Sequence, residues 1–244
     1  MVSHLHRAPW AVVVDLDDTL YPQSAYLAGA AAAVGAAAAA AGLDGPAVHR
    51  ALDAELAAGS DTGGTIDRAL LAAGVVAEDV GEHVPALVAA FVAHRPASLP
   101  LHPGVVEALH ALRAVAPLGC LTDGDPRTQD AKLAATGVLP LLHEVVVTDA
   151  LGSRAVRKPH PAGLLELARR LGVPADRVLV IGDRPDKDVA VAAAVGAPAI
   201  RVRQGEHAHR VDGPTPWRTV DSFPEAAAAA LGALHAAGGL TPSA

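Results

Sequence analysis

Four apolar runs in the sequence each end at an aspartate. They are AVVV before Asp15, LGCLT before Asp123, EVVVT before Asp149, and RVLVI, continued by Gly182, before Asp183. A short apolar run that stops at a polar residue is typical of a strand buried on both faces of a sheet. The sequence therefore predicts at least four buried strands, each with an acid at its carboxyl end.

Helix-like segments lie between the later strands. We expect helices over residues 126–135 and 161–171, and a third over 186–195 that leads to a fifth strand at 198–202. Alternating strands and helices predict an α/β fold with a Rossmann-like parallel sheet and helices on both faces. Ligands bind beyond the carboxyl ends of the strands in such sheets, so we expect the acids to gather at one rim.

The segment after the first strand breaks this rhythm. Residues 22–100 contain Ala, Leu and Val in helical patterns and Gly-rich turns such as GSDTGG, but no convincing strand. This composition predicts an all-helical insertion, here called the cap. The expected domains are an α/β core, residues 1–21 and 100–244, and the helical cap, residues 22–99. Within the core we also expect a helix in HPGVVEALHALRAV, a loop over 203–217, a helix over 225–237 and a frayed tail over 238–244.

Composition limits the classes of partner. Of the 244 residues 51% are hydrophobic, enough for a sizeable buried core, and the net charge is -7. No overall basic field exists to attract nucleic acid or anionic lipid, and aromatic residues are too few for a base-stacking surface. A phosphate-bearing ligand would therefore have to be held by local groups.

Cysteine usage and hydropathy bear on the cellular compartment in which the protein is expected. Cys120 is the only cysteine, so an internal disulfide and a thiolate zinc site are excluded, and a reducing cytoplasm is expected. The N-terminal MVSHLHRAPW lacks the apolar core of a signal peptide. Residues 25–41 carry no charge and approach membrane-spanning length, but Ala and Gly supply little hydrophobic driving force, so we interpret them as a soluble helix with a small-residue packing face.

Asp15 and Asp17 present the first chemical question. Residues i and i+2 at the end of a strand point to the same side, so the two carboxylates share one space. Two anions this close need a cation, or one of them must be protonated, unless the cluster is only a solvated turn. Asp18 points the other way by strand alternation and is expected to be structural.

In combination with other strand ends, the pattern resembles the haloacid dehalogenase-like hydrolase superfamily. DLDDT matches the first motif of that family, LTDG the second, the KP of RKPHP the third and GDRPDKD the fourth, in the family's order. The helical insertion after DLDDTLYP stands where subfamily I carries its type 1 cap, and the resemblance covers the whole chain. It implies the phosphatase branch of the family.

The resemblance also implies a mechanism and a cofactor. Asp15 would be the nucleophile that becomes an aspartyl phosphate, and Asp17 the general acid and base. Mg²⁺ would be held by the Asp15 carboxylate, the Asp17 backbone carbonyl and the Asp183 carboxylate, an all-oxygen set suited to a hard cation.

Phosphate-binding groups follow from the second and third motifs. Lys158 would supply positive charge, and the Thr122 hydroxyl and backbone N–H groups of Asp123 and Gly124 would donate hydrogen bonds. Many relatives have Asn where this chain has Asp123, which leaves the role of that side chain open. Asp188 is expected to support Lys158 or a metal-bound water, or else to be an acid at the start of a helix.

The predicted activity is Mg²⁺-dependent hydrolysis of a small phosphorylated metabolite. A phosphomutase of the same family stays open, as does a catalytically silent binding relative. Asp17 argues against a dehalogenase, and the length argues against a receiver-type signalling domain. A transition-metal site is not expected at the scattered histidines, His94, His102, His160, His207 and His209. Tyr21, Gln23 and Tyr26, just beyond the first motif, are candidates for substrate contact under a closing cap. The identity of the substrate and the oligomeric state stay open.

Overall fold

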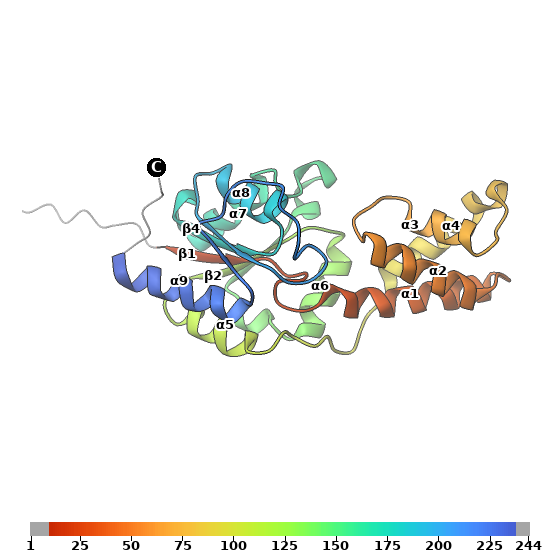
Figure 1. The fold of residues 1–244 in the computed structure, drawn as a ribbon, viewed down its shortest axis with the longest axis horizontal. Coiled ribbons are helices and arrows are strands. Elements are labelled where there is room, and N and C mark those ends of the chain that lie inside the picture. The colour runs from red at the N-terminus through yellow and green to blue at the C-terminus, as the bar shows by residue number, and fades with distance from the viewer. Residues whose placement is uncertain (1–9, 238–244) are drawn as a thin grey trace, which may run out of the picture.

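The computed structural model of the protein describes residues 10–237 (Figure 1). The expected frayed tail and nearly all of the N-terminal MVSHLHRAPW stretch lie outside the described residues. The described chain forms a parallel six-stranded sheet in the order β3-β2-β1-β4-β5-β6. Its strands are β1 (Ala11–Val14), β2 (Leu118–Thr122), β3 (Glu144–Val147), β4 (Val178–Gly182), β5 (Ala199–Val202) and β6 (Arg218–Val220). The predicted α/β class and parallel sheet are confirmed.

Strand β1 lies between β2 and β4, and all four of its residues are buried. Val14, its last residue, is in register with Cys120 of β2 and Ile181 of β4. The chain therefore leaves the sheet at nearly the same level after β1, β2 and β4. Asp15, Asp123 and Asp183 meet at this edge because parallel strands end on the same side.

Helices cover both faces of the sheet (Figure 1). The alternation of side chains along β1 sends Val12 and Val14 into a core shared with α5 and α9, and Ala11 and Val13 into a core shared with α7 and α8. These faces carry the apolar burial that holds the sheet in place. The helices of the core are α5 (Val105–Arg113), α6 (Pro126–Thr136), α7 (Ala162–Leu171), α8 (Ala190–Ala193) and α9 (Phe223–Ala237).

Four helices between β1 and β2 stand beyond the carboxyl edge of the sheet, at the right of Figure 1. They are α1 (Gln23–Ala40), α2 (Gly45–Ala58), α3 (Thr65–Ala72) and α4 (Ala77–Ala93), and they bury an apolar cluster of their own. The Ala-rich α1 packs closely on α2, since a Cβ at Gly35 would overlap His49 of that helix. Across residues 10–237, no helix is long and apolar enough to cross a membrane.

Two elements differ from the sequence prediction. Strand β6 was not predicted, because three residues at the partly exposed edge of a sheet carry no clear apolar pattern. The helix expected over 186–195 starts as a π-helical turn, η5 (Pro185–Val189), in which the Arg184 carbonyl accepts backbone hydrogen bonds from Lys187, Asp188 and Val189. The remaining connections contain short 3-10 turns, η1 (Leu139–Leu141), η2 (Thr148–Leu151), η3 (Arg154–Val156) and η4 (Ala175–Arg177).

Candidate functional site

Lys158 is the buried cation at the carboxyl edge of the sheet. Its Nζ donates to Asp15 Oδ1 at 2.5 Å, to Asp188 Oδ1 at 2.7 Å and to the Leu121 carbonyl at 3.1 Å. Burial alone would lower the pKa of Lys158, but the neighbouring Asp15 and Asp188 carboxylates outweigh it and hold the pKa well above its ordinary value. The side chain is therefore a fixed ammonium between two carboxylates.

Three buried carboxylates share this region. Oxygen atoms of Asp15, Asp183 and Asp188 all lie within 4.8 Å of one another. Burial, with repulsion from Asp188 and Asp17, raises the pKa of Asp15 to about 7 despite Lys158. Burial and the same crowding by carboxylates also raise the pKa of Asp183. One lysine does not balance three acids, so the cluster is short of positive charge.

Asp188 reaches this cluster through a close backbone approach. Its Oδ2 accepts from the Arg184 N–H at 2.9 Å, and a Cβ at Gly182 would overlap the Asp188 carboxyl group. The Gly-Asp pair at the end of β4 thus gives Asp188 room beside Asp183. The structure places Asp188 against Lys158, one of the three arrangements considered from the sequence.

Asp17 has partners that Asp15 lacks. Its carboxylate accepts from Tyr21 Oη at 2.5 Å, from Lys132 Nζ at 2.8 and 2.9 Å, and from Gln129 Nε2 at 3.1 Å. Burial pushes the pKa of Asp17 upward, but Lys132 and these hydrogen bonds outweigh it and leave the pKa below its ordinary value. The Asp17 carboxylate is thus held in one orientation as an anion.

Sequence reasoning missed Gln129 and Lys132. They lie three residues apart on α6, which begins at Pro126, shortly after the end of β2. That spacing puts both side chains on one helix face, toward the sheet edge. It was the signal in the sequence from which their place in the site could have been predicted.

The second motif packs beside Lys158. Thr122 accepts from Gln129 Nε2 at 2.5 Å, and Asp123 Oδ1 accepts from Thr148 Oγ1 at 2.8 Å and from the Lys158 N–H at 3.1 Å. The Asp123 side chain therefore ties the third motif to the second, an arrangement that the sequence left open. Gly124 follows with a φ of 136°, a backbone conformation that favours glycine.

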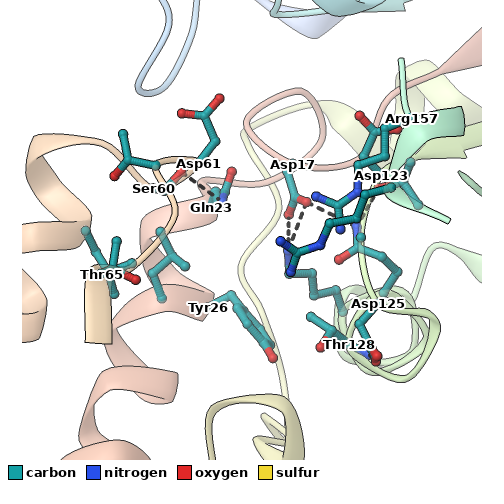
Figure 2. A pocket seen from close by; sticks show the side chains of 18 of the residues that line it. Asp17, Gln23, Tyr26, Ser60, Asp61, Thr65, Asp123, Asp125, Thr128 and Arg157 are labelled. Carbon is teal, nitrogen blue, oxygen red and sulfur yellow. Dashed lines mark hydrogen bonds and ion pairs between the residues drawn. The ribbon is translucent and has the colours of Figure 1, made fainter. Parts of the chain in front are cut away.

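The three residues suggested for substrate contact separate in the structure. Tyr21 and Tyr26 are both fully buried, but the Tyr21 hydroxyl donates to Asp17, whereas Gln23 and Tyr26 line a cavity of about 490 Å³ between the core and the cap. The turn after β1 causes this difference: Asp18 has a φ of 54°, and its carboxylate accepts from the N–H groups of Gln23 and Glu206. Figure 2 shows Gln23 and Tyr26 across the cavity from Asp123 and Arg157.

The cap touches the core beside this cavity. Asp61 Oδ2 accepts from Arg184 Nη1 at 2.6 Å, and Ser60 donates to Glu206 from Oγ at 2.6 Å and from its N–H at 3.1 Å. Both cap residues belong to the GSDTGG segment. The cavity is therefore closed on this side by polar contacts between the cap and the core.

The other residues considered from the sequence have ordinary surroundings. Asp149 forms a bidentate ion pair with Arg157, both distances being 2.6 Å. His207 lines the cavity and contacts Arg184 Nη1 at 3.1 Å. Within residues 10–237, the only group of three or more potential metal ligands is Asp15, Asp183 and Asp188.

Known proteins resemble the chain over most of its length. It is 34% identical to a glyceraldehyde 3-phosphate phosphatase of Methanopyrus kandleri, over 81% of this chain and 85% of that protein. It is 35% identical to a phosphoglycolate phosphatase of Rhodospirillum rubrum, over 81% of this chain and 80% of that protein. The fold matches the HAD-hydrolase YfnB of Bacillus subtilis, a magnesium-bound structure, with a TM-score of 0.64 and 17% identity over 90% of this chain and 97% of that one.

The family model agrees with these relatives and with the site geometry. A model of haloacid dehalogenase-like hydrolases matches residues 11–196, which contain all four motifs. The matched region supplies Asp15, Asp17, Thr122, Lys158 and Asp183 at one sheet edge. The chain belongs to the haloacid dehalogenase-like hydrolase family.

Proposed function

We propose that the protein is a Mg²⁺-dependent phosphatase that hydrolyses a small phosphomonoester through an aspartyl phosphate on Asp15. The observation that carries the proposal is the unequal pair of carboxylates in one cavity. Asp15 lies in the carboxylate cluster beside Lys158, whereas Asp17 is oriented separately by Lys132, Gln129 and Tyr21. Such a division of environments suits one nucleophile and one proton-transfer group.

The donor set fits a hard divalent cation. The Asp183 side chain is buried, and within residues 10–237 its carboxylate has one hydrogen bond, from Thr19 Oγ1 at 3.5 Å. A buried carboxylate with so little compensation needs positive charge. We propose that the Asp15 and Asp183 carboxylates and the Asp17 backbone carbonyl hold Mg²⁺, with Asp188 acting through Lys158. Bound there, Mg²⁺ would neutralise the crowded acids and the negative charge of the phosphoryl group.

The side chains divide the remaining work. An Asp15 carboxylate oxygen attacks phosphorus while Lys158, the Thr122 hydroxyl and the Asp123 and Gly124 N–H groups hold the phosphoryl oxygens. The leaving oxygen takes a proton from Asp17, which then accepts a proton from the water that attacks the aspartyl phosphate. Because the ion pair with Lys132 favours the Asp17 anion, the acid step requires that pair to loosen when substrate enters.

We further propose the division into a catalytic core, residues 1–21 and 100–244, and a cap, residues 22–99. The apolar cluster of α1–α4 and the polar contacts of Ser60 and Asp61 with the core support a cap that moves as a unit. Opening would admit the substrate, and closing would exclude bulk water.

Asp15→Asn tests the proposed function. Asn keeps the size and the Lys158 contact of the side chain but is not a nucleophile, so turnover of p-nitrophenyl phosphate with Mg²⁺ is expected to fall on the order of 10⁴-fold or more. Circular dichroism and thermal unfolding of the variant serve as the control for folding. Turnover near the wild-type rate in a folded Asp15→Asn protein would refute the mechanism.

A further inference from the structure

The two walls of the cavity differ in charge. On the cap wall, the described residues include no lysine, arginine or histidine, and the charged side chains are Asp61 and Asp67. The cap otherwise presents neutral polar groups and carbon. They are Gln23, Tyr26, Ser60, Thr62 and Thr65, with Gly63 and Gly64, and the apolar Leu27, Leu56, Ile66, Val88, Phe91 and Val92.

The cations of the cavity all come from the core, and carboxylates already engage most of them. Lys132 pairs with Asp17, Lys158 with Asp15 and Asp188, Arg157 with Asp149, and Arg184 with Asp61 and Asp186, all at 2.5–2.8 Å. Lys187 Nζ lies 3.8 Å from Asp123. In the described part of the chain, Arg154 alone among these lysines and arginines has no carboxylate within 4.0 Å, and it is exposed. One exposed arginine is a weak site for a second anionic group of a substrate.

The cap wall also offers an unsatisfied neutral group. The Tyr26 hydroxyl is buried and has no hydrogen-bond partner within residues 10–237. Its ring stands 4.8 Å from Lys132 Nζ, which in turn holds Asp17. Because the whole Tyr26 side chain is buried, a hydroxyl or carbonyl group of the substrate would reach and satisfy this phenol only after the cap has moved.

We propose that the cap selects phosphomonoesters whose alcohol portion is uncharged and hydroxylated, such as a small aldose or polyol, and discriminates against those that carry a second anionic group. This inference rests on the proposed function, because it concerns the leaving group of that reaction. The phosphate faces Lys158 and the backbone N–H groups of the core, so the alcohol portion must face the cap. A carboxylate there would meet Asp61, Asp67 and carbon instead of a cation, which disfavours binding by repulsion and desolvation.

Matched substrate pairs test the discrimination. Glyceraldehyde 3-phosphate and 3-phosphoglycerate differ only at C1, as do glycolaldehyde phosphate and 2-phosphoglycolate, and glucose 6-phosphate and 6-phosphogluconate. With the full-length protein and Mg²⁺, kcat/KM measured by phosphate release is expected to favour the uncharged member by about tenfold or more in at least one pair. Preference for the acid in the pairs that react, or no pair in which the uncharged member is faster, overturns the inference.

A charge placed on the cap tests where the alcohol portion lies. Val88 lines the cavity and is 42% exposed, so α4 accepts a longer side chain at this position. Val88→Lys is expected to raise kcat/KM for the acid relative to its uncharged partner by about fivefold or more, and the matched Val88→Gln should leave that ratio near the wild-type value. An unchanged ratio in Val88→Lys would mean that the alcohol portion does not approach α4, and the inference would fail.

The experiments distinguish failure of the phosphatase proposal from failure of the inference about the cap. p-Nitrophenyl phosphate reports phosphatase chemistry without testing the cap, because its leaving group is unrelated to the paired metabolites. Turnover of this ester that depends on Asp15, combined with preference for acids, leaves the phosphatase proposal standing and removes the inference about the cap. Absence of turnover on every ester removes both.

Discussion

The core edge and the cap wall enclose the same cavity but are built differently. The core edge consists of charged side chains that are buried and paired, such as Lys158 with Asp15, and they follow strands fixed by the sheet ladder. The cap wall carries no cation among the described residues: it consists of neutral groups with Asp61 and Asp67, and it touches the core partly through exposed contacts such as Asp61 with Arg184. The difference supports our proposals that the rigid edge performs the chemistry and that the cap selects the substrate and controls access.

Of these changes, removal of the metal should lower the rate of phosphate release most, and it acts only at the core edge. EDTA is expected to bring phosphate release to the background rate and Mg²⁺ to restore it, because Asp15, Asp183 and Asp188 lack enough positive charge without a cation. The affinity for Mg²⁺, measured by titration calorimetry, should weaken as the pH falls below about 7. Burial raises the pKa of Asp15 to about 7, so below that pH a proton competes with the metal for this carboxylate.

A rate that EDTA does not change would contradict the proposed metal site. The Asp15→Asn protein provides the blank for phosphate released by contaminants. Ca²⁺ in place of Mg²⁺ gives a further control, since its looser coordination should support binding better than turnover.

Lys132→Met should have an intermediate effect that depends on the leaving group. Met keeps much of the length and volume of the side chain but no longer orients Asp17. For an alkyl phosphate, kcat/KM is expected to fall by about tenfold to a hundredfold, because the alkoxide needs a proton from a correctly oriented Asp17 and the lost orientation outweighs the easier protonation of Asp17. For p-nitrophenyl phosphate the fall should be much smaller, since p-nitrophenolate leaves without one.

Two variants serve as comparisons for that experiment. Lys132→Arg should recover part of the loss because it restores a cation beside Asp17, and Lys187→Met removes a different lysine of the cavity that does not contact Asp17. Equal losses on the alkyl and aryl esters in Lys132→Met would show that Lys132 only stabilises the fold.

Asp61→Asn should change the kinetics least, because it alters only a contact of the cap with the core. Asp61 is 42% exposed in its ion pair with Arg184, and pairs of this kind contribute about 1 kcal/mol or less, so KM is expected to change by less than about fivefold with kcat nearly constant. Steady-state kinetics at two ionic strengths would measure the change, which should shrink in high salt. A large fall in kcat would mean that Asp61 belongs to the chemistry and that the comparison between cap and core is wrong.

Much of the core was predictable because its signals are local. Each apolar run before an acid encodes a buried strand, and parallel strands must end on one side, so Asp15, Asp123 and Asp183 were expected to meet before any contact was known. Strand β6 carried no comparable signal. Its three residues are held by pairing with β5 and not by an apolar pattern of their own.

The environment of Asp17 shows where local signals end. Tyr21 was expected near the substrate because it follows the first motif, yet the left-handed turn at Asp18 directs its hydroxyl to Asp17. Lys132 reaches the same carboxylate from 115 positions further along the chain. Contacts of this kind depend on how α6 packs against the end of β1, which no local pattern specifies.

The sequence by itself determined the strands, the acids at their ends and the order of the four motifs, because periodicity and spacing are properties of neighbouring residues. Only the tertiary structure decided which cation meets which carboxylate: Lys158 beside Asp15 and Asp188, and Lys132 beside Asp17. It also decided that the described residues of the cap wall present Asp61, Asp67 and neutral groups to the cavity but no cation. Both outcomes arise when distant segments pack together, since a buried charge is costly without a partner and the cations of the cavity therefore stand beside the acids of the core.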